Sequence, residues 1–183
     1  LRNETFKGSL HHFFRSLYFD EVAKNGFEIR KIKFVSDDEI SRVKTVYKEF
    51  QDRKALKSLV KDSAEYYNKV KSLGIDENRI LLDKLLSRNE IISAAADSNL
   101  KRMYFKDMIQ VLYLNKKITP EFAKTIPAYR SGEQIRTDFF LKADRPIFLY
   151  SNGSYFDGHD LILDGYWAWS EKVATMLPSD FVP

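Results

Sequence analysis

Residues Pro146–Pro183 have the sequence PIFLYSNGSYFDGHDLILDGYWAWSEKVATMLPSDFVP. The pattern predicts a strand, a tight turn at Ser151-Asn152-Gly153, a second strand and an aromatic helix. The turn is expected because Asn-Gly tolerates positive φ at both central positions of a hairpin. The helix should begin near Tyr166 and end before Pro178, since proline cannot continue a helix. We expect the rest of the chain to cover this segment.

The composition is that of a globular protein. The 183 residues are 44% hydrophobic and 31% charged, which is enough for one core and short for two. The 30 basic and 26 acidic residues interleave along the chain and leave a net charge of +4. Nucleic-acid-binding proteins usually gather their basic residues on one face or in one run, so we expect no nucleic-acid partner.

Several classes of protein are excluded by what the sequence lacks. It contains no cysteine, so disulfides, thiol nucleophiles and cysteine-ligated zinc are impossible. No apolar run reaches the roughly 18–20 residues of a membrane helix, so we expect a chain that does not span a membrane. The chain begins with Leu1 and shows no signal-peptide pattern. We therefore expect residues 1–183 to form a single domain cut from a longer protein.

Helical patterns occupy the N-terminal third of the chain. Apolar residues at helical spacing follow the N-cap residue Ser9 and continue to Val22, and Asn25-Gly26 should stop this first helix. Good helix formers fill most positions from Glu39 to Leu73. Two helices separated near Gln51–Lys54 are the preferred interpretation, and one long helix is the alternative.

Strand patterns dominate the remainder, and Asn115–Arg136 reads as a loop with one helical turn after Thr119-Pro120. The secondary structure of Ile80–Leu86 is ambiguous, and Glu90–Ala96 could be a strand or a loop.

The fold class is α+β: an antiparallel sheet packed against the N-terminal and C-terminal helices, with a helical middle segment. The strands expected in that sheet are Phe27–Val35, with a change of phase that suggests a bulge, and Lys101–Phe105, Met108–Leu114, Thr137–Lys142, Ile147–Tyr150 and Tyr155–Ile162.

Four segments together resemble a known family. They are Gly8-Ser9-Leu10-His11-His12-Phe13 with Asn25-Gly26-Phe27; Tyr66-Tyr67-Asn68-Lys69-Val70; the strands around Phe105 and Val111–Tyr113; and Asn152-Gly153-Ser154-Tyr155 leading to Gly165-Tyr166-Trp167-Ala168-Trp169 and Leu177-Pro178.

With these segments the chain resembles the C-terminal region of Bacteroidetes envelope proteins called carboxypeptidase regulatory-like domain-containing proteins, a family of unknown function. The resemblance implies a periplasmic or outer-membrane-associated protein with a β-sandwich domain upstream of this region. It implies partners among other envelope proteins, that upstream β-sandwich domain or glycan. It implies no peptidase activity and supplies no functional residues.

The adjacent histidines His11 and His12 are the first candidates for a functional site. His11 and His12 are adjacent, and neighbours on a helix point about 100° apart, whereas a helical metal pair shares one face at i and i+4. The third histidine, His159, is distant in sequence. We therefore expect no metal site, with one of the pair half-buried and the other solvated.

The acidic loop after the predicted hairpin is the other candidate. Asp157, His159 and Asp160 lie close together there, but the spacing of a calcium loop is missing, and a turn with a capping Asp is the favoured interpretation. Ser154 sits beside a hairpin turn rather than on a nucleophile elbow, so a Ser154-His159-Asp157 relay is disfavoured.

The aromatic residues near this loop have two interpretations. Tyr155 and Trp167 could offer flat faces to a sugar ring. Alternatively, Tyr166 and Trp169 begin a core stripe that continues through Val173 and Leu177, which would leave Trp167 off the stripe and exposed or at an interface. The candidate ligand-binding residues are Tyr155, Asp157, His159, Asp160 and Trp167.

The sequence is consistent with two functions. The first is a non-enzymatic interaction or structural module of a bacterial cell-envelope protein, which predicts an exposed aromatic patch. The alternative is a glycan- or cell-wall-binding module, or a hydrolase, with a site near Tyr155–Asp164, which predicts a concave pocket there. No catalytic residue, metal or cofactor is assigned.

Overall fold

The computed structural model describes residues 2–53, 61–74, 77–142 and 145–170. The described residues form two compact units: unit 1 consists of those within 2–31 and 84–170, and unit 2 consists of those within 32–83. The strands β1 (Phe27–Phe34) and β2 (Arg79–Leu85) carry the chain from one unit to the other. The assignment of residues 1–183 to a single domain stays a prediction. The α+β class is confirmed.

Unit 1 begins with the short helix α1 (Arg2–Phe6) and the longer helix α2 (Leu10–Phe19). Ser9 caps α2 as predicted, because its hydroxyl accepts a hydrogen bond from His12 N–H at 3.1 Å. The helix ends earlier than the sequence suggested. Asp20 adopts the left-handed conformation at φ 59°, and its backbone N–H bonds to Ser16 O. Asp tolerates this conformation better than most residues, so the helix needs no glycine to stop there.

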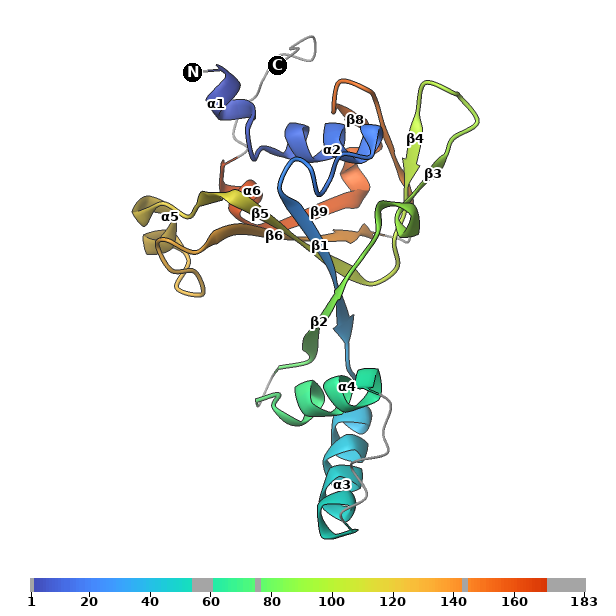
Figure 1. Ribbon diagram of the computed structural model, residues 1–183, viewed down its shortest axis with the longest axis vertical. Coiled ribbons are helices and arrows are strands. Elements are labelled where there is room, and N and C mark those ends of the chain that lie inside the picture. The colour runs from blue at the N-terminus through green and yellow to red at the C-terminus, as the bar shows by residue number, and fades with distance from the viewer. Residues whose placement is uncertain (1, 54–60, 75–76, 143–144, 171–183) are drawn as a thin grey trace. The chain divides into compact units, whose positions relative to one another are not determined.

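The expectation of one antiparallel sheet is wrong, because the strands form two sheets (Figure 1). The five-stranded sheet has the order β2-β1-β5-β6-β9 and the four-stranded sheet has the order β3-β4-β7-β8. Besides β1 and β2, the strands are β3 (Ile92–Ala94), β4 (Lys101–Met103), β5 (Met108–Lys117), β6 (Gln134–Leu141), β7 (Ile147–Leu149), β8 (Tyr155–Phe156) and β9 (Leu161–Gly165).

Two corners explain why the sequence pattern suggested one sheet. Asp107, at φ 68°, lies between β4 and β5, but β4 pairs with β3 and β7 whereas β5 pairs with β6. The chain therefore changes sheets at this point instead of making a hairpin. The predicted strand Tyr155–Ile162 is also divided. The 3-10 turn η4 (Gly158–Asp160) separates β8, in the four-stranded sheet, from β9, in the five-stranded sheet.

Both segments whose structure is ambiguous in the sequence contain a strand. Ile80–Leu86 corresponds to β2, and Glu90–Ala96 contains the end of the 3-10 turn η2 (Arg88–Glu90) followed by β3. The helical turn expected after Thr119-Pro120 is present as α5 (Pro120–Thr125). Thr119 caps it, since its hydroxyl accepts a hydrogen bond from Phe122 N–H at 3.4 Å.

The core of unit 1 is built around aromatic rings. The Phe13 ring of α2 lies 5.3 Å from the ring of Phe27, 5.6 Å from that of Phe139 and 5.5 Å from that of Trp167. Trp167 belongs to α6 (Tyr166–Ser170), which follows β9 directly. These contacts place α2 and α6 against the five-stranded sheet (Figure 1).

The expectation that Trp167 is exposed or at an interface is wrong. Trp167 is only 1% exposed, and its indole Nε1–H donates a hydrogen bond of 2.7 Å to Gly8 O. Trp169, expected in the core, is partly buried and packs beside Tyr166, with ring centroids 5.9 Å apart. The predicted end of the helix before Pro178 lies outside the described residues.

The hairpin between β7 and β8 depends on Gly153. Gly153 N–H donates to Tyr150 O at 3.0 Å, and Gly153 itself has φ +91°. Asn152 does not have positive φ, so the turn is a three-residue loop closed by a left-handed glycine rather than the two-residue turn that Asn-Gly suggested. The glycine also lies against α2, where a Cβ would overlap the carbonyl oxygen of His11.

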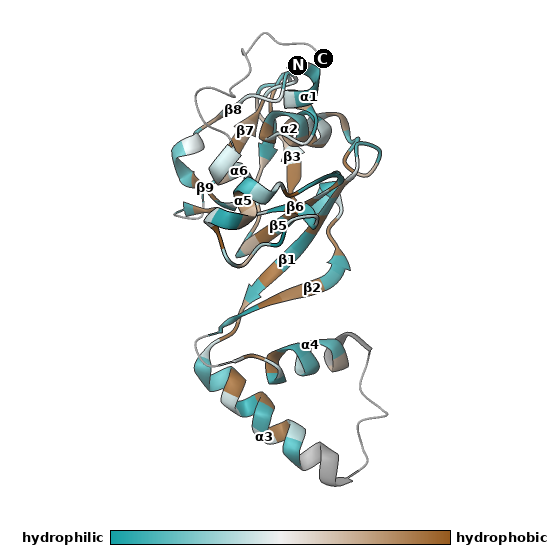
Figure 2. Ribbon diagram, turned by 90° about the vertical axis from the view of Figure 1, so that its left-hand side faces the viewer, coloured by the Kyte–Doolittle hydropathy of each residue, from teal (hydrophilic) through white to brown (hydrophobic). Residues whose placement is uncertain are grey.

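Unit 2 contains the helices α3 (Asp37–Arg53) and α4 (Lys61–Lys71), which confirms two helices instead of one. Apolar residues recur among hydrophilic ones in the coloured part of α3 (Figure 2). The change of phase expected in β1 occurs at Ile32, which is buried and is the first residue of unit 2. The small core of this unit consists of Val35, Val43, Val70, Leu73 and Ile80.

The sequence predicts a chain that does not span a membrane, and the length and hydropathy of the helices bear on this prediction. Within residues 2–53, 61–74, 77–142 and 145–170, no helix is both long and apolar enough to cross a bilayer.

Replacing Gly153 by alanine should destabilise the protein by about 2–4 kcal/mol, because alanine is strained at positive φ and its Cβ would displace α2. Gly132 is the matched control: it has φ +89°, but a Cβ there meets no atom within 4 Å. G132A should therefore show the backbone cost alone, about 1–2 kcal/mol. Urea unfolding monitored by circular dichroism measures both. Equal losses in the two variants would contradict the contact between the hairpin and α2.

Trp167→Phe should lower the free energy of unfolding by about 2–4 kcal/mol, since it leaves Gly8 O without its donor and opens space in the core. Trp169→Phe, at a partly buried ring, should cost less than half as much. Chemical denaturation of the two variants provides the comparison. A W167F protein as stable as W169F would show that the indole hydrogen bond contributes little.

Candidate functional site

The loop that the sequence singled out is exposed but does not gather its side chains. Asp157, in the left-handed conformation at φ 62°, and His159 are exposed. Asp160 is half-buried, with one carboxylate oxygen 4.0 Å from the Arg145 guanidinium. The described residues contain no group of three His, Asp or Glu side chains that could hold a metal ion. These acids are therefore separate surface groups.

The two aromatic candidates near this loop have different positions. The Tyr155 ring is 36% exposed and packs edge-on against Phe14 of α2, with centroids 5.0 Å apart. It also lies against Gly158, where a Cβ would overlap the ring. Trp167 is buried in the core, so it is not at the surface beside Tyr155. The structure thus does not bring the five predicted residues together.

A different surface of unit 1 carries two of its exposed aromatic residues, Tyr150 and Phe156. In the four-stranded sheet, Arg102 pairs with Phe148 and Phe148 pairs with Phe156. Residues paired in register share a face of a sheet. Their strand neighbours Met103 and Ile147 are fully buried, so alternation along each strand points Arg102, Phe148 and Phe156 away from the core.

The same alternation adds two tyrosines to this surface. Tyr104 and Tyr150 each lie two residues after a member of the row, and the Arg102 guanidinium sits 5.1 Å from the centroid of the Tyr104 ring. Phe156 is 56% exposed and Tyr150 is 43% exposed. We call this surface the outer aromatic face, which consists of Arg102, Tyr104, Phe148, Tyr150 and Phe156.

The sequence contains a signal for part of this face. Ile147, Phe148, Leu149 and Tyr150 are all apolar or aromatic, so the run reads as a buried strand. Once Ile147 and Leu149 are assigned to the core, Phe148 and Tyr150 must face outward. The contribution of Arg102 and Tyr104 could not be inferred, because the pairing of β4 with β7 is not evident in the sequence.

The histidine pair is buried more than expected. His12 is 9% exposed, and its ring lies 4.8 Å from that of Phe6 and 5.0 Å from that of Phe27. Burial lowers the pKa of His12 to about 4, and the positive charges of Lys7 and Arg15 act in the same direction. Burial also lowers the pKa of His11, which is half-buried. Neither histidine is the solvated one that the sequence suggested, and both are neutral at pH 7.

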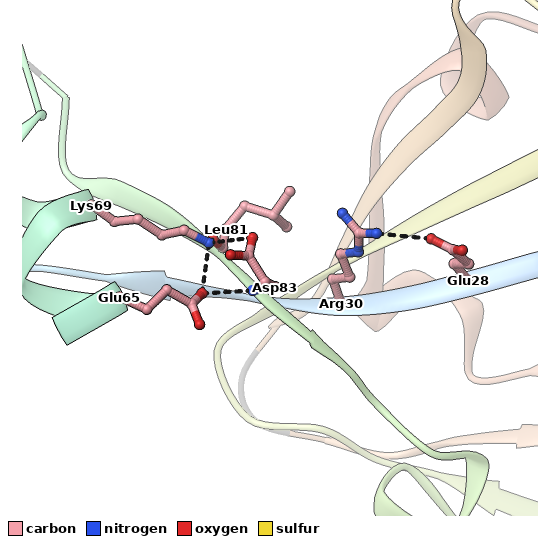
Figure 3. A network of polar contacts seen from close by, with 6 residues as sticks. All are labelled: Glu28, Arg30, Glu65, Lys69, Leu81 and Asp83. Atoms are coloured by element: carbon pink, nitrogen blue, oxygen red, sulfur yellow. Dashed lines mark hydrogen bonds and ion pairs between the residues drawn. The ribbon is translucent and has the colours of Figure 1, made fainter. Parts of the chain in front are cut away.

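Unit 2 contains a network of polar contacts (Figure 3). The Lys69 ammonium on α4 donates to Glu65 Oε1 at 2.8 Å, to Asp83 Oδ1 at 2.5 Å and to Leu81 O at 2.5 Å. Glu65 Oε1 also accepts from Asp83 N–H at 2.9 Å. The network therefore fastens the end of β2 to α4.

The chemistry of Lys69 is that of a structural cation. Burial alone would lower the pKa of Lys69, but its hydrogen bonds to Asp83 and Glu65 raise the pKa above the ordinary value. A lysine acting as a nucleophile or general base needs a lowered pKa. All three ammonium donors of Lys69 already have acceptors. Lys69 therefore stabilises unit 2 and is not a catalytic candidate.

Comparison with known proteins adds no further identification, since no protein-family model, curated protein or solved structure matches this chain.

Acid should destabilise the protein through His12. The pKa of His12 is about 4 in the folded state against an ordinary 6.5, so the unfolded chain binds a proton first as the pH falls. Stability should be complete above pH 6.5 and decline toward pH 4, by about 3 kcal/mol at 1.36 kcal/mol per pKa unit. Urea unfolding at several pH values measures the decline, to which His11 contributes with the same sign.

The variant His12→Gln isolates this contribution, because glutamine does not titrate and retains an acceptor for Gly8 N–H. H12Q should show a flatter dependence of stability on pH than the wild type. The control H159Q replaces an exposed histidine and should keep the wild-type dependence. If H12Q and the wild type lose stability in parallel, the buried histidine is not the source.

Proposed function

We propose that this chain is a non-enzymatic interaction module of a bacterial cell-envelope protein, periplasmic or associated with the outer membrane, and that its partner is a protein bound on the outer aromatic face. The envelope setting rests on the resemblance of the sequence segments given above. The binding role rests on the chemistry of the face itself.

The observation that carries this proposal is the aromatic character of a water-facing sheet surface. Antiparallel sheets with one solvated face normally place polar side chains on it. Here Phe148, Tyr150 and Phe156 occupy such positions, and the last two are 43% and 56% exposed. Aromatic residues and arginine are the residues most enriched at protein interfaces and at their energetic centres. A partner that covers these rings removes them from water, which favours association.

The charges of the face indicate what the partner offers. Arg102 is the one charged residue among the five residues of the face, and its guanidinium stacks on Tyr104. A carboxylate on the partner can pair with this guanidinium while apolar side chains cover the rings. We therefore expect an apolar patch bordered by Asp or Glu on the partner. The five residues of the outer aromatic face include no Asp, Glu or His beside Arg102. This set of side chains therefore suits binding rather than acid–base catalysis.

The face is better suited to docking than to strand addition. β8 is the last strand of the four-stranded sheet, but it has only two residues. Short edge strands offer few backbone groups for pairing with another chain. The partner should therefore contact the side chains of the sheet face.

The alternative, a glycan- or cell-wall-binding module or a hydrolase near Tyr155–Asp164, has weaker support. None of the three described pockets draws a lining residue from this loop. Tyr155 packs against Phe14 and Gly158, and Trp167 is buried. The aromatic platform and the convergent acids that this alternative required are not formed by the described residues.

Phe156→Ser should reduce capture of the partner from a solubilised envelope fraction at least about tenfold, because truncating a central aromatic residue of an interface costs roughly 1–2 kcal/mol or more. The matched control is Leu114→Ser, which removes a side chain that is 43% exposed on β5 of the other sheet. L114S should capture as much as the wild type, and thermal unfolding should show both variants folded.

The capture should be measured quantitatively for the wild type, F156S and L114S, with Arg102→Gln as a fourth protein. Capture that F156S and R102Q leave unchanged would overturn the assignment of the face. Loss of capture in L114S as well would mean that the binding is non-specific and would also count against it. A saturable thermal shift with neutral glycans that F156S abolishes would replace the protein partner by a glycan.

A further inference from the structure

A pocket of about 620 Å³ opens in unit 1 between α1, the start of α2 and β5. It is separate from the outer aromatic face, since no residue of that face lines it. Its volume lies within the range of about 300–1,000 Å³ that is usual for small-molecule sites. Its lining residues are Asn3, Glu4, Phe6, Lys7, His12, Lys24, Asn25, Tyr113, Asn115 and Lys116.

The floor of the pocket is aromatic and fixed. Phe6, His12 and Tyr113 are buried, and the His12 ring lies 4.8 Å from the Phe6 ring and 5.9 Å from the Tyr113 ring. Gly8, at φ +76°, allows the Tyr113 ring to lie directly on the backbone, where a Cβ would overlap it. Phe6 is only 6% exposed and Tyr113 only 4%, so these packed rings offer a small, fixed apolar contact that does not need to reorganise on binding.

His12 adds a directional donor to this floor. Its Nδ1 accepts a hydrogen bond from Gly8 N–H at 3.1 Å, so the neutral ring carries its proton on Nε2. Within the described part of the chain, the Nε2–H group of His12 has no hydrogen-bond acceptor. His12 Nε2 is not among the fully buried side-chain atoms that lack a partner, so this donor keeps some contact with solvent, and an oxygen atom of a ligand would supply it with an acceptor.

The rim of the pocket is cationic. Among the described lining residues, Lys7, Lys24 and Lys116 are cationic and Glu4 is the one acid. Lys24 pairs with Glu21 at 2.5 Å, but Lys7 and Lys116 form no ion pair with any described residue. Two lysines beside one pocket that form no ion pair with the described residues favour an anionic ligand.

Three side-chain amides complete the lining. Asn3, Asn25 and Asn115 each provide donor and acceptor groups, and the amide of Asn115 lies against Gly26, where a Cβ would overlap it. Amides that both donate and accept suit hydroxyl groups, which do the same. An apolar floor, amides and ammonium groups together match a ring with one apolar side, several hydroxyls and a negative charge.

We propose that this pocket binds an acidic monosaccharide unit, a sugar ring that carries a carboxylate. The ring contacts the accessible parts of Tyr113 and Phe6, one of its oxygens accepts the hydrogen bond from His12 Nε2–H, and Lys7 and Lys116 pair with the carboxylate. A phosphate is disfavoured, because no arginine is among the described residues that line the pocket and Ser9 already caps α2, whereas phosphate sites commonly use arginine forks or free helix N-termini.

The test is a titration of the full chain with D-glucuronate, followed by amide and imidazole NMR signals. D-Glucose is the matched ligand control, since it has the same ring without the carboxylate, and acetate and inorganic phosphate are the anion controls. Glucuronate should give saturable shifts at His12, Tyr113 and Asn115. Glucose and the two anions should each bind at least about tenfold more weakly, and added salt should weaken glucuronate binding.

The variants Lys7→Gln, Lys116→Gln and Asn115→Asp should each weaken glucuronate binding by about fivefold or more, because they remove or oppose the positive rim. Lys106→Gln, an exposed lysine outside the pocket, is the control and should bind like the wild type. N115D preserves the shape of Asn115, so its effect would not come from misfolding.

Other outcomes overturn the inference. Equal binding of glucose would remove the need for the charge, and equal binding of phosphate or acetate would mean an anion site without a sugar. Absence of glucuronate shifts at tens of millimolar, or shifts that K7Q, K116Q and N115D leave unchanged, would show that the pocket is not this site. These results leave the protein-binding role of the outer aromatic face unaffected, because F156S does not alter the pocket.

Discussion

The hydrogen bond from Trp167 Nε1 to Gly8 O joins positions 159 residues apart and is the contact on which unit 1 depends most. Gly8 serves three partners at once: its carbonyl accepts from Trp167, its N–H donates to His12, and its Cα lies under the Tyr113 ring. One residue thereby connects α6, α2 and β5. Only glycine fits, because φ is +76° and the Tyr113 ring leaves no room for a Cβ.

Both candidate binding regions depend on α2, which this contact holds in place. At its start, His12 forms part of the floor of the pocket. On another side, Arg15 donates to Ser151 O at 3.3 Å and Phe14 packs on Tyr155, so the helix supports the β7–β8 hairpin. The outward side of that hairpin carries Phe148 and Phe156. A binding surface held on regular elements loses little conformational entropy when a partner binds.

The sequence predicted elements better than it predicted their arrangement. The cap at Ser9, the turn after Thr119 and the division between α3 and α4 follow from local chemistry, and all three are present. The two sheets could not be foreseen, because Lys106-Asp107 between two strands has the pattern of a hairpin. The prediction that Trp167 is exposed is wrong because helical periodicity does not show how many sides of a helix are covered. Helical periodicity assigns one buried stripe, but α6 is covered by Phe122 beside Tyr166 and by Phe13 and Phe139 beside Trp167.

The same distinction separates the two candidate regions. The outer aromatic face comes partly from one short run, Phe148 to Tyr150, so alternation could have revealed it. The pocket combines side chains from α1, α2, the turn after α2 and β5, and no local pattern in the sequence marks such a set.

The polar groups of unit 2 differ from those of the pocket, because all three donors of the Lys69 ammonium already have acceptors within the unit. The buried cluster of unit 2 contains five of its described residues, and these charges add to its stability, since a small core leaves more of the fold to polar contacts. The exposed rings of the outer aromatic face, and the two pocket lysines that form no ion pair with a described residue, all lie in unit 1, which is therefore the unit to which both proposals assign binding.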